Sequence, residues 1–285
     1  MKIRFGYEIA YDSVHGVAMV VMLRAQPNSG QWIIQPDDMV IEPQRPHTSY
    51  IDVFGNTCTR FVCSGGIVSL RADGIIEDSG MPEPQILDAQ EIPVAHLPSD
   101  TLQYLLASRY CETDLLMTEA WRLFGHLAPG WSRVQAICDF VNQYVTFGYQ
   151  YASSTKTAFQ TYVERCGVCR DFAHLAIAFC RCLNIPARYC TAYLGDIGVP
   201  PVNAPMDFAG AMEVYLGGAW HSFDPRNNAR RIGRIMIARG HDAGDVAIST
   251  AFGNSFLRSF RVWTDEISEQ QLSQFMASTS VVRAA

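Results

Sequence analysis

One cysteine of this 285-residue chain lies where its thiol could act as a nucleophile. Cys169 begins a segment whose apolar residues recur at offsets of three and four, which predicts a helix that ends near Asn184 and Pro186. The apolar positions are Phe172, Leu175, Ala176, Phe179, Cys180 and Leu183. In the first turn of a helix, unpaired N–H groups and the helix dipole stabilise a thiolate, so we expect the pKa of Cys169 to lie below about 8.5. A buried structural cysteine is the alternative interpretation.

Cys166 and Cys169 form a CxxC motif, which has three further interpretations. Thioredoxin-like redox chemistry needs a strand before the motif, and the segment 155–165 lacks a strand pattern. A zinc site would also need Cys180 and Cys182, which stand about 200° apart on a helix and cannot both face one ion. We therefore expect no metal and no cofactor. The remaining hypothesis is a disulfide between Cys166 and Cys169 that caps the nucleophile under oxidation.

The segments around Cys169 predict an α+β domain. Ser132 predicts the amino-terminal cap of a second helix, in which apolar residues recur as far as Val145. Strand patterns follow the Cys169 helix at 187–194, 211–216, 220–224, 235–238, 245–250 and 259–264. A helix followed by antiparallel strands is typical of the α+β class.

The first 80 residues predict a small β-sandwich. Apolar side chains alternate from Ile3 to Tyr11, which indicates a half-buried strand, and Gly55-Asn56 indicates a hairpin turn. Further strand patterns lie at 17–23, 50–54, 57–63 and 67–72. Four prolines between residues 81 and 98 predict an irregular connection. The expected organisation is a β domain (1–80), a proline-rich connection (81–98), a core domain (99–267) and a tail (268–285).

These segments resemble the bacterial branch of the transglutaminase-like superfamily, whose members are described as cysteine proteases. The segment 167–189 looks like the nucleophile helix and the following strand of that family, and 206–224 is similar to its strand pair that carries the rest of a Cys-His-Asp triad. The resemblance covers nearly the whole chain, since the amino-terminal strands look like the β domain of this branch. It implies a papain-like, transglutaminase-core fold with helices packed on an antiparallel sheet. It also implies that Cys169 attacks an amide or ester carbonyl, while Asp224 orients a histidine that accepts the thiol proton.

The histidine position of the family holds Ala209 in this chain. The family pattern has the base directly after an Asp-Phe pair, whereas here Asp207 and Phe208 are followed by Ala209. If residues 217–218 form a two-residue turn, strand pairing puts Ala209 diagonal to Asp224 on the same face of the sheet. A histidine at that position would reach the carboxylate, and alanine cannot.

Three other histidines are the possible replacements. His221 is three residues before Asp224, an odd offset that points the two side chains to opposite faces of one strand. His174 is rotated by about 140° from Cys169 on the helix. His241 lies in a glycine-rich loop that could fold over the site. The candidate catalytic residues are therefore Cys169 and Asp224, with His221 as the candidate base.

Composition excludes several classes of protein. Hydrophobic residues make up 48% and charged residues 18%, which is typical of a globular chain. The net charge of −6 argues against nucleic-acid binding. The early sequence has neither a signal peptide nor a membrane span, and nine scattered cysteines indicate reduced thiols, so we expect a cytoplasmic protein without a membrane partner.

A cluster of arginines follows Asp224 and has two interpretations. It consists of Arg226, Arg230, Arg231, Arg234 and Arg239. The expected role is a solvated face that pairs with the excess carboxylates. The functional alternative is recruitment of an acidic peptide or another anion near the site.

Two functions follow from the sequence. The first is a transglutaminase-like cysteine hydrolase or acyltransferase that acts through Cys169 and is impaired because Ala209 replaces the histidine. The second is a catalytically inactive relative that binds a peptide or protein in the old cleft. Both predict a peptide or protein as substrate or ligand, and the sequence does not indicate an oligomeric state.

Overall fold

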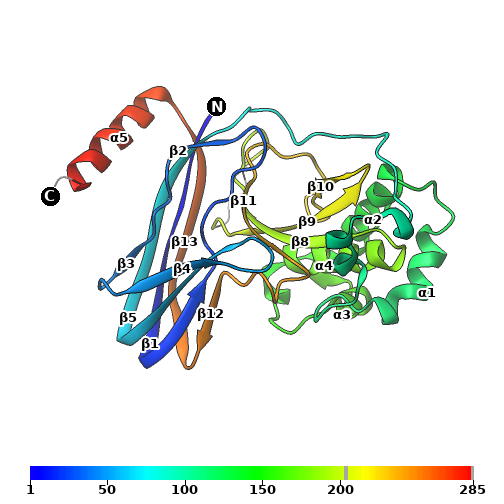
Figure 1. Ribbon diagram of the computed structural model, residues 1–285, viewed down its shortest axis with the longest axis horizontal. Coiled ribbons are helices and arrows are strands. Elements are labelled where there is room, and N and C mark those ends of the chain that lie inside the picture. Colours follow the sequence, from blue (N-terminus) through cyan, green and yellow to red (C-terminus); the bar gives the residue numbers. More distant parts are fainter. Residues whose placement is uncertain (202–204, 284–285) are drawn as a thin grey trace.

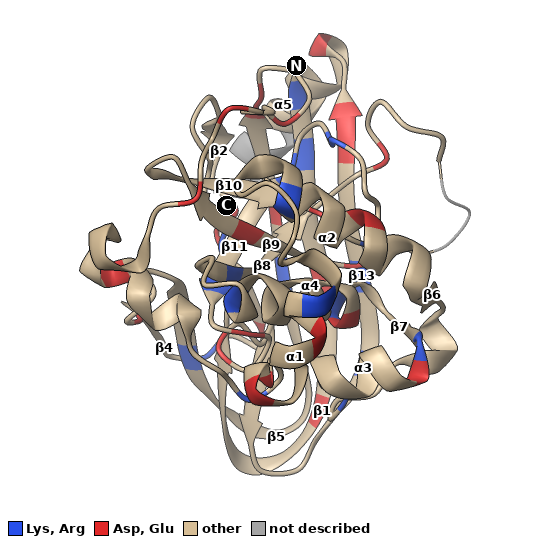
Figure 2. Ribbon diagram, turned by 90° about the vertical axis from the view of Figure 1, so that its right-hand side faces the viewer, with Lys and Arg blue, Asp and Glu red and all other residues tan. Residues whose placement is uncertain are grey.

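The computed structural model describes residues 1–201 and 205–283 and has the predicted α+β fold. A large antiparallel sheet forms one end of the molecule and most of the helices form the other, with a second antiparallel sheet between them (Figure 1). After a turn of 90°, the helices lie in front of this second sheet (Figure 2). The chain therefore has one sheet that stands apart and one that forms a core with helices.

The amino-terminal sheet is built on two long strands, β1 (Lys2–Val21) and β5 (Thr57–Glu77), which pair antiparallel along almost their whole length. Alternate residues of β1 are buried, as the sequence period predicts. Three short strands pair with β5, namely β2 (Trp32–Gln35), β3 (Val40–Glu42) and β4 (His47–Ile51). Two strands from the end of the chain pair with β1, namely β12 (Ser249–Phe252) and β13 (Ser255–Ile267).

Strands β1 and β5 are each continuous, whereas the sequence predicts a break within each of them. In β1 the expected interruption is a β-bulge between His15 and Val17. In β5, Gly65 and Gly66 have φ angles of +92° and +77°, so the strand bends where a turn was expected. The strands predicted as a small sandwich therefore form one seven-stranded sheet in which every partner pairs with β1 or β5. The predicted hairpin is present, with its turn between β4 and β5.

The location of β12 and β13 also differs from the sequence expectation, which placed them in the core region 99–267. Both strands pair with β1. The physical reason is that β5 covers one edge of β1 and leaves twenty residues of backbone donors and acceptors on the other edge to be paired. The two strands satisfy these groups.

The second sheet and helix α4 (Cys169–Cys182) form the core that positions the candidate site. The sheet has the strand order β10–β9–β8–β11. Its strands are β8 (Ala187–Tyr193), β9 (Ala209–Leu216), β10 (Ala219–Phe223) and β11 (Ile235–Gly240), close to the predicted ranges. Helix α4 is buried at every position from Asp171 to Cys182 and packs on β8 and β9. The predicted apolar stripe therefore lies in the centre of the protein.

Further helices cover α4. They are α1 (Thr113–Phe124), α2 (Trp131–Tyr144) and α3 (Ala158–Glu164). Helix α2 matches the helix predicted from Ser132, although Gly130 is its amino-terminal cap. The minor elements are a parallel pair, β6 (Thr146–Phe147) with β7 (Cys166–Gly167), and 3₁₀ turns at Val94–His96, Ser99–Leu105 and Tyr149–Tyr151. Helix α5 (Glu269–Arg283) follows β13, in the tail for which no helix or strand was predicted.

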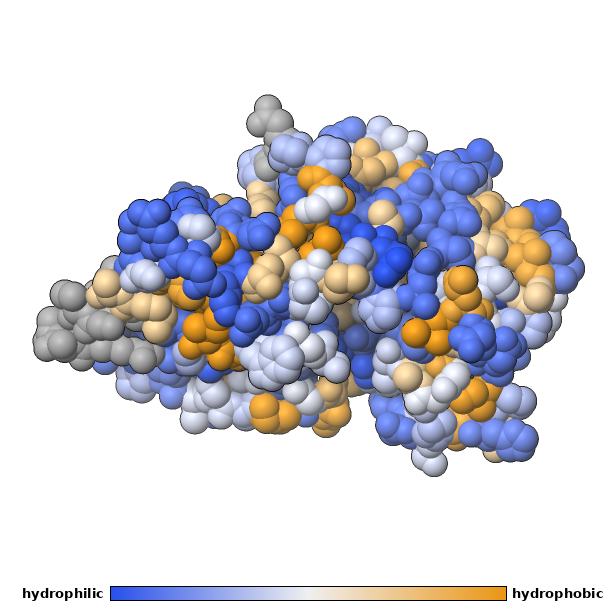
Figure 3. Space-filling view, turned by 90° about the horizontal axis from the view of Figure 1, so that it is seen from above, coloured by the Kyte–Doolittle hydropathy of each residue, from blue (hydrophilic) through white to orange (hydrophobic). Residues whose placement is uncertain are grey.

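The surface seen from above carries small hydrophobic patches separated by hydrophilic residues (Figure 3). In the part of the chain that the structure describes, every helix is too short or too polar to span a bilayer.

Candidate active site around Cys169

Cys169 is the first residue of α4, as the sequence predicts. The carboxylate of Asp171 caps this helix, because its Oδ2 accepts a hydrogen bond from the backbone N–H of Val168 at 2.9 Å. Arg170 holds the other oxygen of Asp171 at 3.0 Å. A Cβ atom on Gly167 would lie 2.7 Å from Asp171 Oδ2, so only glycine leaves room for the cap. These contacts fix the position of the thiol.

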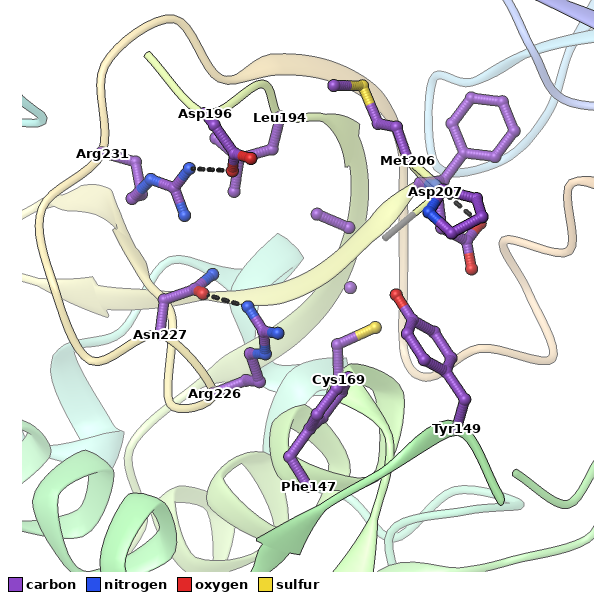
Figure 4. A pocket seen from close by; sticks show the side chains of 14 residues that line it. Phe147, Tyr149, Cys169, Leu194, Asp196, Met206, Asp207, Arg226, Asn227 and Arg231 are labelled. Carbon is purple, nitrogen blue, oxygen red and sulfur yellow. Dashed lines mark hydrogen bonds and ion pairs between the residues drawn. The ribbon is translucent and has the colours of Figure 1, made fainter. Parts of the chain in front are cut away.

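The Cys169 side chain lines two adjoining cavities. The first, which we term the Cys169 pocket, has a volume of about 180 Å³ and is lined by the side chains shown in Figure 4. The second, which we term the apolar cavity, has a volume of about 480 Å³ and is lined in part by Tyr189, Val246, Ile248 and Phe260. The thiol therefore lies at the junction of a pocket of mixed polarity and a larger, more apolar one.

The pKa of Cys169 does not follow the sequence expectation. Burial raises this pKa above its ordinary value, and the charges of Asp207 and Asp224 act in the same direction. Backbone hydrogen bonds from Gly210 and Arg170 favour the thiolate but do not outweigh burial. The residue as a whole is partly exposed, yet its sulfur is enclosed by protein. The predicted lowering of the pKa is therefore wrong, because the enclosure removes the water that would solvate a thiolate.

Two polar side chains that sequence reasoning did not select also point into the Cys169 pocket: Tyr149 and Asp207 (Figure 4). Burial raises the pKa of Asp207, while a hydrogen bond from the backbone N–H of Phe208 acts against this rise. Burial also raises the pKa of Tyr149, and the charges of Asp207 and Cys169 add to the effect. The sequence could have pointed to Asp207 as a site residue, because it belongs to the family-like motif. Tyr149 lies outside every motif.

Ala209 lies in the wall of the Cys169 pocket, where the family resemblance places a histidine. It is the first residue of β9, and the β9–β10 hairpin has the predicted register, with Leu216 opposite Ala219 and Met212 opposite Phe223. Continuing this register by one residue puts Asp224 opposite Ala211, diagonal to Ala209. An alanine methyl group thus occupies the position that the family resemblance gives to the imidazole.

Asp224 is held by an arginine and an asparagine. Arg234 Nη2 donates a hydrogen bond to Asp224 Oδ2 at 2.8 Å, and the backbone N–H and Nδ2 of Asn227 donate to the two oxygens at 2.9 and 2.7 Å. Burial raises the pKa of Asp224, but the charge of Arg234 and these hydrogen bonds outweigh it, so the pKa lies below its ordinary value. Both carboxylate oxygens therefore already have strong donors.

None of the three candidate histidines reaches Cys169. His221 hydrogen-bonds through Nε2 with the carbonyl oxygen of Leu216 at 3.1 Å and packs against Trp131, so the structure does not support it as the base. His241 pairs through Nδ1 with Asp245 Oδ2 at 2.8 Å. All seven histidines of the chain lie in the described residues, and none lines the Cys169 pocket or the apolar cavity.

His174 is enclosed within the core. Its ring stacks on Tyr110 with 5.1 Å between the ring centres, and its Nε2 accepts a hydrogen bond from the backbone N–H of Ala243 at 3.1 Å. Burial lowers the pKa of His174 to about 3. The residue is therefore a neutral structural group and not a base for Cys169.

The nine cysteines are unpaired in this structure. Cys166 and Cys169 are both partly exposed and the other seven are buried. The segment before the CxxC motif is helix α3 and not a strand, so the context that thioredoxin-like chemistry requires is missing. Within residues 1–201 and 205–283, no group of three or more histidine, cysteine, aspartate or glutamate side chains is placed to hold a metal ion.

The arginine cluster does not form the solvated face that the sequence predicts. Arg231 and Arg234 are buried, and Arg230 is the exposed member. Arg226 and Arg231 line the Cys169 pocket. Asp224 and Glu83 draw Arg234 inward by pairing with it at 2.8 and 2.5 Å. The predicted pairing with carboxylates is present for Arg231, Arg234 and Arg239, but the burial of Arg231 and Arg234 was not predicted.

Comparison with known proteins agrees with this arrangement. Residues 123–225, which include Cys169, Ala209 and Asp224, match the model of the transglutaminase-like superfamily. An uncharacterized protein of Mycobacterium leprae is 33% identical over 84 residues, which are 28% of this chain and 30% of that protein. The chain therefore spans about 30% of the length of this curated relative.

A solved structure matches almost the whole chain. It is described as a "Putative Cysteine Protease from Cytophaga hutchinsonii", is 30% identical, and superposes with a TM-score of 0.83 over 94% of this chain and 91% of that one. Its likeness extends over the amino-terminal sheet as well as the core that bears Cys169. The protein described here belongs to the transglutaminase-like superfamily.

Proposed function

We propose that this protein binds a peptide or protein segment in the cavities beside Cys169, and that hydrolysis or acyl transfer through this thiol is strongly impaired. The observation that carries the proposal is Ala209 in the wall of the Cys169 pocket, in a chain whose seven histidines all lie in the described residues and line neither cavity. The family resemblance supplies the acyl chemistry, and the missing imidazole limits it.

The loss of the base affects two chemical steps. An enclosed thiol with a raised pKa is almost entirely protonated near neutral pH, so the attacking thiolate is rare. The amine that leaves an amide also needs a proton, which an imidazolium would supply. General acid–base catalysis is worth about 10²- to 10⁴-fold in rate, so its loss leaves slow turnover of amides and faster reaction only with activated esters.

The cavities themselves favour binding. The Cys169 pocket offers charged and hydrogen-bonding groups, and the adjoining apolar cavity offers aromatic and aliphatic side chains. A few polar groups beside a larger apolar surface is the usual composition of a ligand site.

A second candidate is hydrolysis with Asp207 as the proton acceptor. It is favoured by the position of Asp207 beside the thiol and by its raised pKa. The carboxyl remains a much weaker base than the Cys169 thiolate, because the pKa of the thiol is raised as well. This mechanism therefore gives slow turnover that the Asp207→Asn variant removes.

The test is the pH profile of Cys169 alkylation by iodoacetamide, followed site by site with mass spectrometry. We expect an inflection above about 8.5, the value of a free thiol. The Cys166→Ser variant is the matched control, because it removes the other partly exposed thiol and leaves the profile unchanged. In parallel, wild type should hydrolyse peptide amides only slightly faster than Cys169→Ser. An inflection near neutral pH, together with amide turnover that Cys169→Ser abolishes, would refute the proposal.

A further inference from the structure

The Cys169 pocket has two arginines and one acid, Asp196, at one end and a second acid, Asp207, at the other. Arg226 and Arg231 lie on one side of the thiol, and Asp207 lies with Tyr149 on the other (Figure 4). The catalytic chemistry discussed above uses neither arginine. The excess of positive charge at the arginine end is therefore not explained by that chemistry.

The guanidinium of Arg226 has no acidic partner in the described part of the chain. Its Nη1 donates a hydrogen bond to the side-chain oxygen of Asn227, and its plane lies over the ring of Phe147, 4.3 Å from the ring centre. Among the described residues, no carboxylate lies within 4.0 Å of it. The ring and the amide position this cation without neutralising it.

Arg231 is buried and incompletely satisfied. Its side chain is 7% exposed, and its Nη2 donates to the carbonyl oxygen of Gly195 at 2.8 Å. The nearest acid, Asp196, is 3.6 Å away and about one-third exposed. The Nε–H of Arg231 is buried and has no hydrogen-bond partner in residues 1–201 and 205–283. A buried donor of this kind is costly unless a ligand or water pairs with it.

The two guanidinium groups also repel each other. Burial lowers the pKa of Arg231, and the charges of Arg234 and, to a smaller extent, Arg226 act in the same direction, while Asp224 and Asp196 act against it. An anion in contact with both groups would offset this repulsion and supply acceptors for their remaining donors. A planar carboxylate suits the geometry, because guanidinium donors pair with its two oxygens.

We propose that Arg226 and Arg231 form a subsite for the carboxylate of a peptide ligand, which places the ligand's preceding backbone beside Cys169. The inference rests on the proposed function and names its ligand class. The pocket of about 180 Å³ is smaller than a usual ligand site of about 300–1,000 Å³, so it accepts the end of a ligand, and the adjoining apolar cavity accepts the residues before it. Asp207 at the opposite end repels a second anion and favours an N–H donor or a cation.

The test uses peptide mixtures on the unmodified protein. The probe is a mixture of N-acetylated tripeptides of random sequence, prepared once with free carboxyl termini and once with amidated termini. Binding is measured as protection of Cys169 from iodoacetamide, resolved by mass spectrometry. We expect the free acids to protect at concentrations about tenfold or more below those of the amides, since a hydrogen-bonded ion pair is lost on amidation. The bound carboxylate belongs either to the peptide terminus or to an acidic side chain. An amidated mixture with glutamate in the last position distinguishes the two, because protection equal to that of the free acids would identify the side chain.

Two variants locate the effect. In Arg226→Gln, which can still hydrogen-bond to Asn227, the preference for the free acids should fall about tenfold or more. In Arg230→Gln, which removes an exposed arginine outside the Cys169 pocket, the preference should remain. Equal protection by acids and amides in the wild type would overturn the carboxylate subsite while leaving the binding function standing. Protection by neither mixture would overturn the binding function and this inference with it.

Discussion

Arg234 Nη2 lies 2.8 Å from Asp224 Oδ2, and the two side chains are 1% and 2% exposed. The same guanidinium donates through Nε to Glu83 Oε1 at 2.5 Å. Glu83 belongs to the proline-rich connection, so one buried arginine joins the connection to the end of the β9–β10 hairpin. The family resemblance gives Asp224 the role of orienting a base, but in this chain Asp224 pairs with a structural arginine.

Replacing Arg234 by methionine should destabilise the protein by about 3–5 kcal/mol, because two carboxylates would lose the cation that compensates their burial. The loss should be visible as a lower midpoint in urea denaturation followed by circular dichroism. Arg230→Met is the matched control, since it removes an exposed arginine four residues earlier and should change stability by less than about 0.5 kcal/mol. Equal effects of the two substitutions would show that the buried pair has no special role.

Ala209→His should restore part of the missing chemistry. The new imidazole would lie in the wall of the Cys169 pocket, diagonal to Asp224, and could accept the thiol proton. We expect turnover of an activated thioester to rise at least tenfold, within the range of about 10²- to 10⁴-fold for general acid–base catalysis, and alkylation of Cys169 near pH 7 to accelerate.

The control for this substitution is Ala219→His, which adds a histidine to an exposed position of β10. It should leave thioester turnover and Cys169 alkylation unchanged. If Ala209→His behaves like Ala219→His, a missing imidazole is not what limits the site.

The stability of the protein should fall as the pH is lowered from about 6.5 to about 3, in part because of His174. Burial lowers the pKa of His174 to about 3, whereas an unfolded histidine has a pKa of about 6.5. Between these values the unfolded state binds a proton that the folded state excludes, so His174 contributes a slope of up to about 1.4 kcal/mol per pH unit. His174→Gln, which keeps an acceptor for the Ala243 N–H, should show a shallower slope in urea denaturation at pH 4 to 6.

Absolute stability is not the measure in this experiment, because His174→Gln also changes packing. His126→Gln, at an exposed position, is the control and should keep the wild-type slope. An unchanged slope in His174→Gln would mean that His174 titrates in the folded state much as it does in the unfolded one.

Mild oxidation should link Cys166 to Cys169. These two residues are partly exposed and lie three positions apart at the start of α4, whereas the other seven cysteines are buried. Peptide mapping by mass spectrometry should find the disulfide and a complete loss of iodoacetamide labelling at Cys169, and Cys166→Ser should prevent the link. Oxidised protein without this disulfide would exclude the redox cap.

The nucleophile helix was predictable because a single sequence period determines its buried face. From Phe172 to Leu183 the offsets of three and four mark the side of α4 that packs on the second sheet. The β9–β10 hairpin was predictable for a similar reason, since Gly217 and Gly218 both adopt positive φ angles and fix the register.

Features that depend on contacts between residues far apart in the sequence were not predictable. The positive end of α4 suggested a low pKa for Cys169, but β9 covers the thiol, and nothing in the local sequence encodes that cover. Arg234 is read as a surface residue until Glu83, about 150 positions earlier, is brought beside it. Bends in β1 and β5 were read as turns because glycine permits both.

The pairing of β12 and β13 with β1 makes the Cys169-bearing core an insertion within a host sheet, because the chain leaves that sheet after β5 and returns to it only at β12. A protease that nicks the proline-rich connection would therefore release nothing: the severed amino-terminal piece would keep its strands hydrogen-bonded to those of the carboxyl-terminal piece. The two fragments should behave as a split protein that holds together until it is denatured.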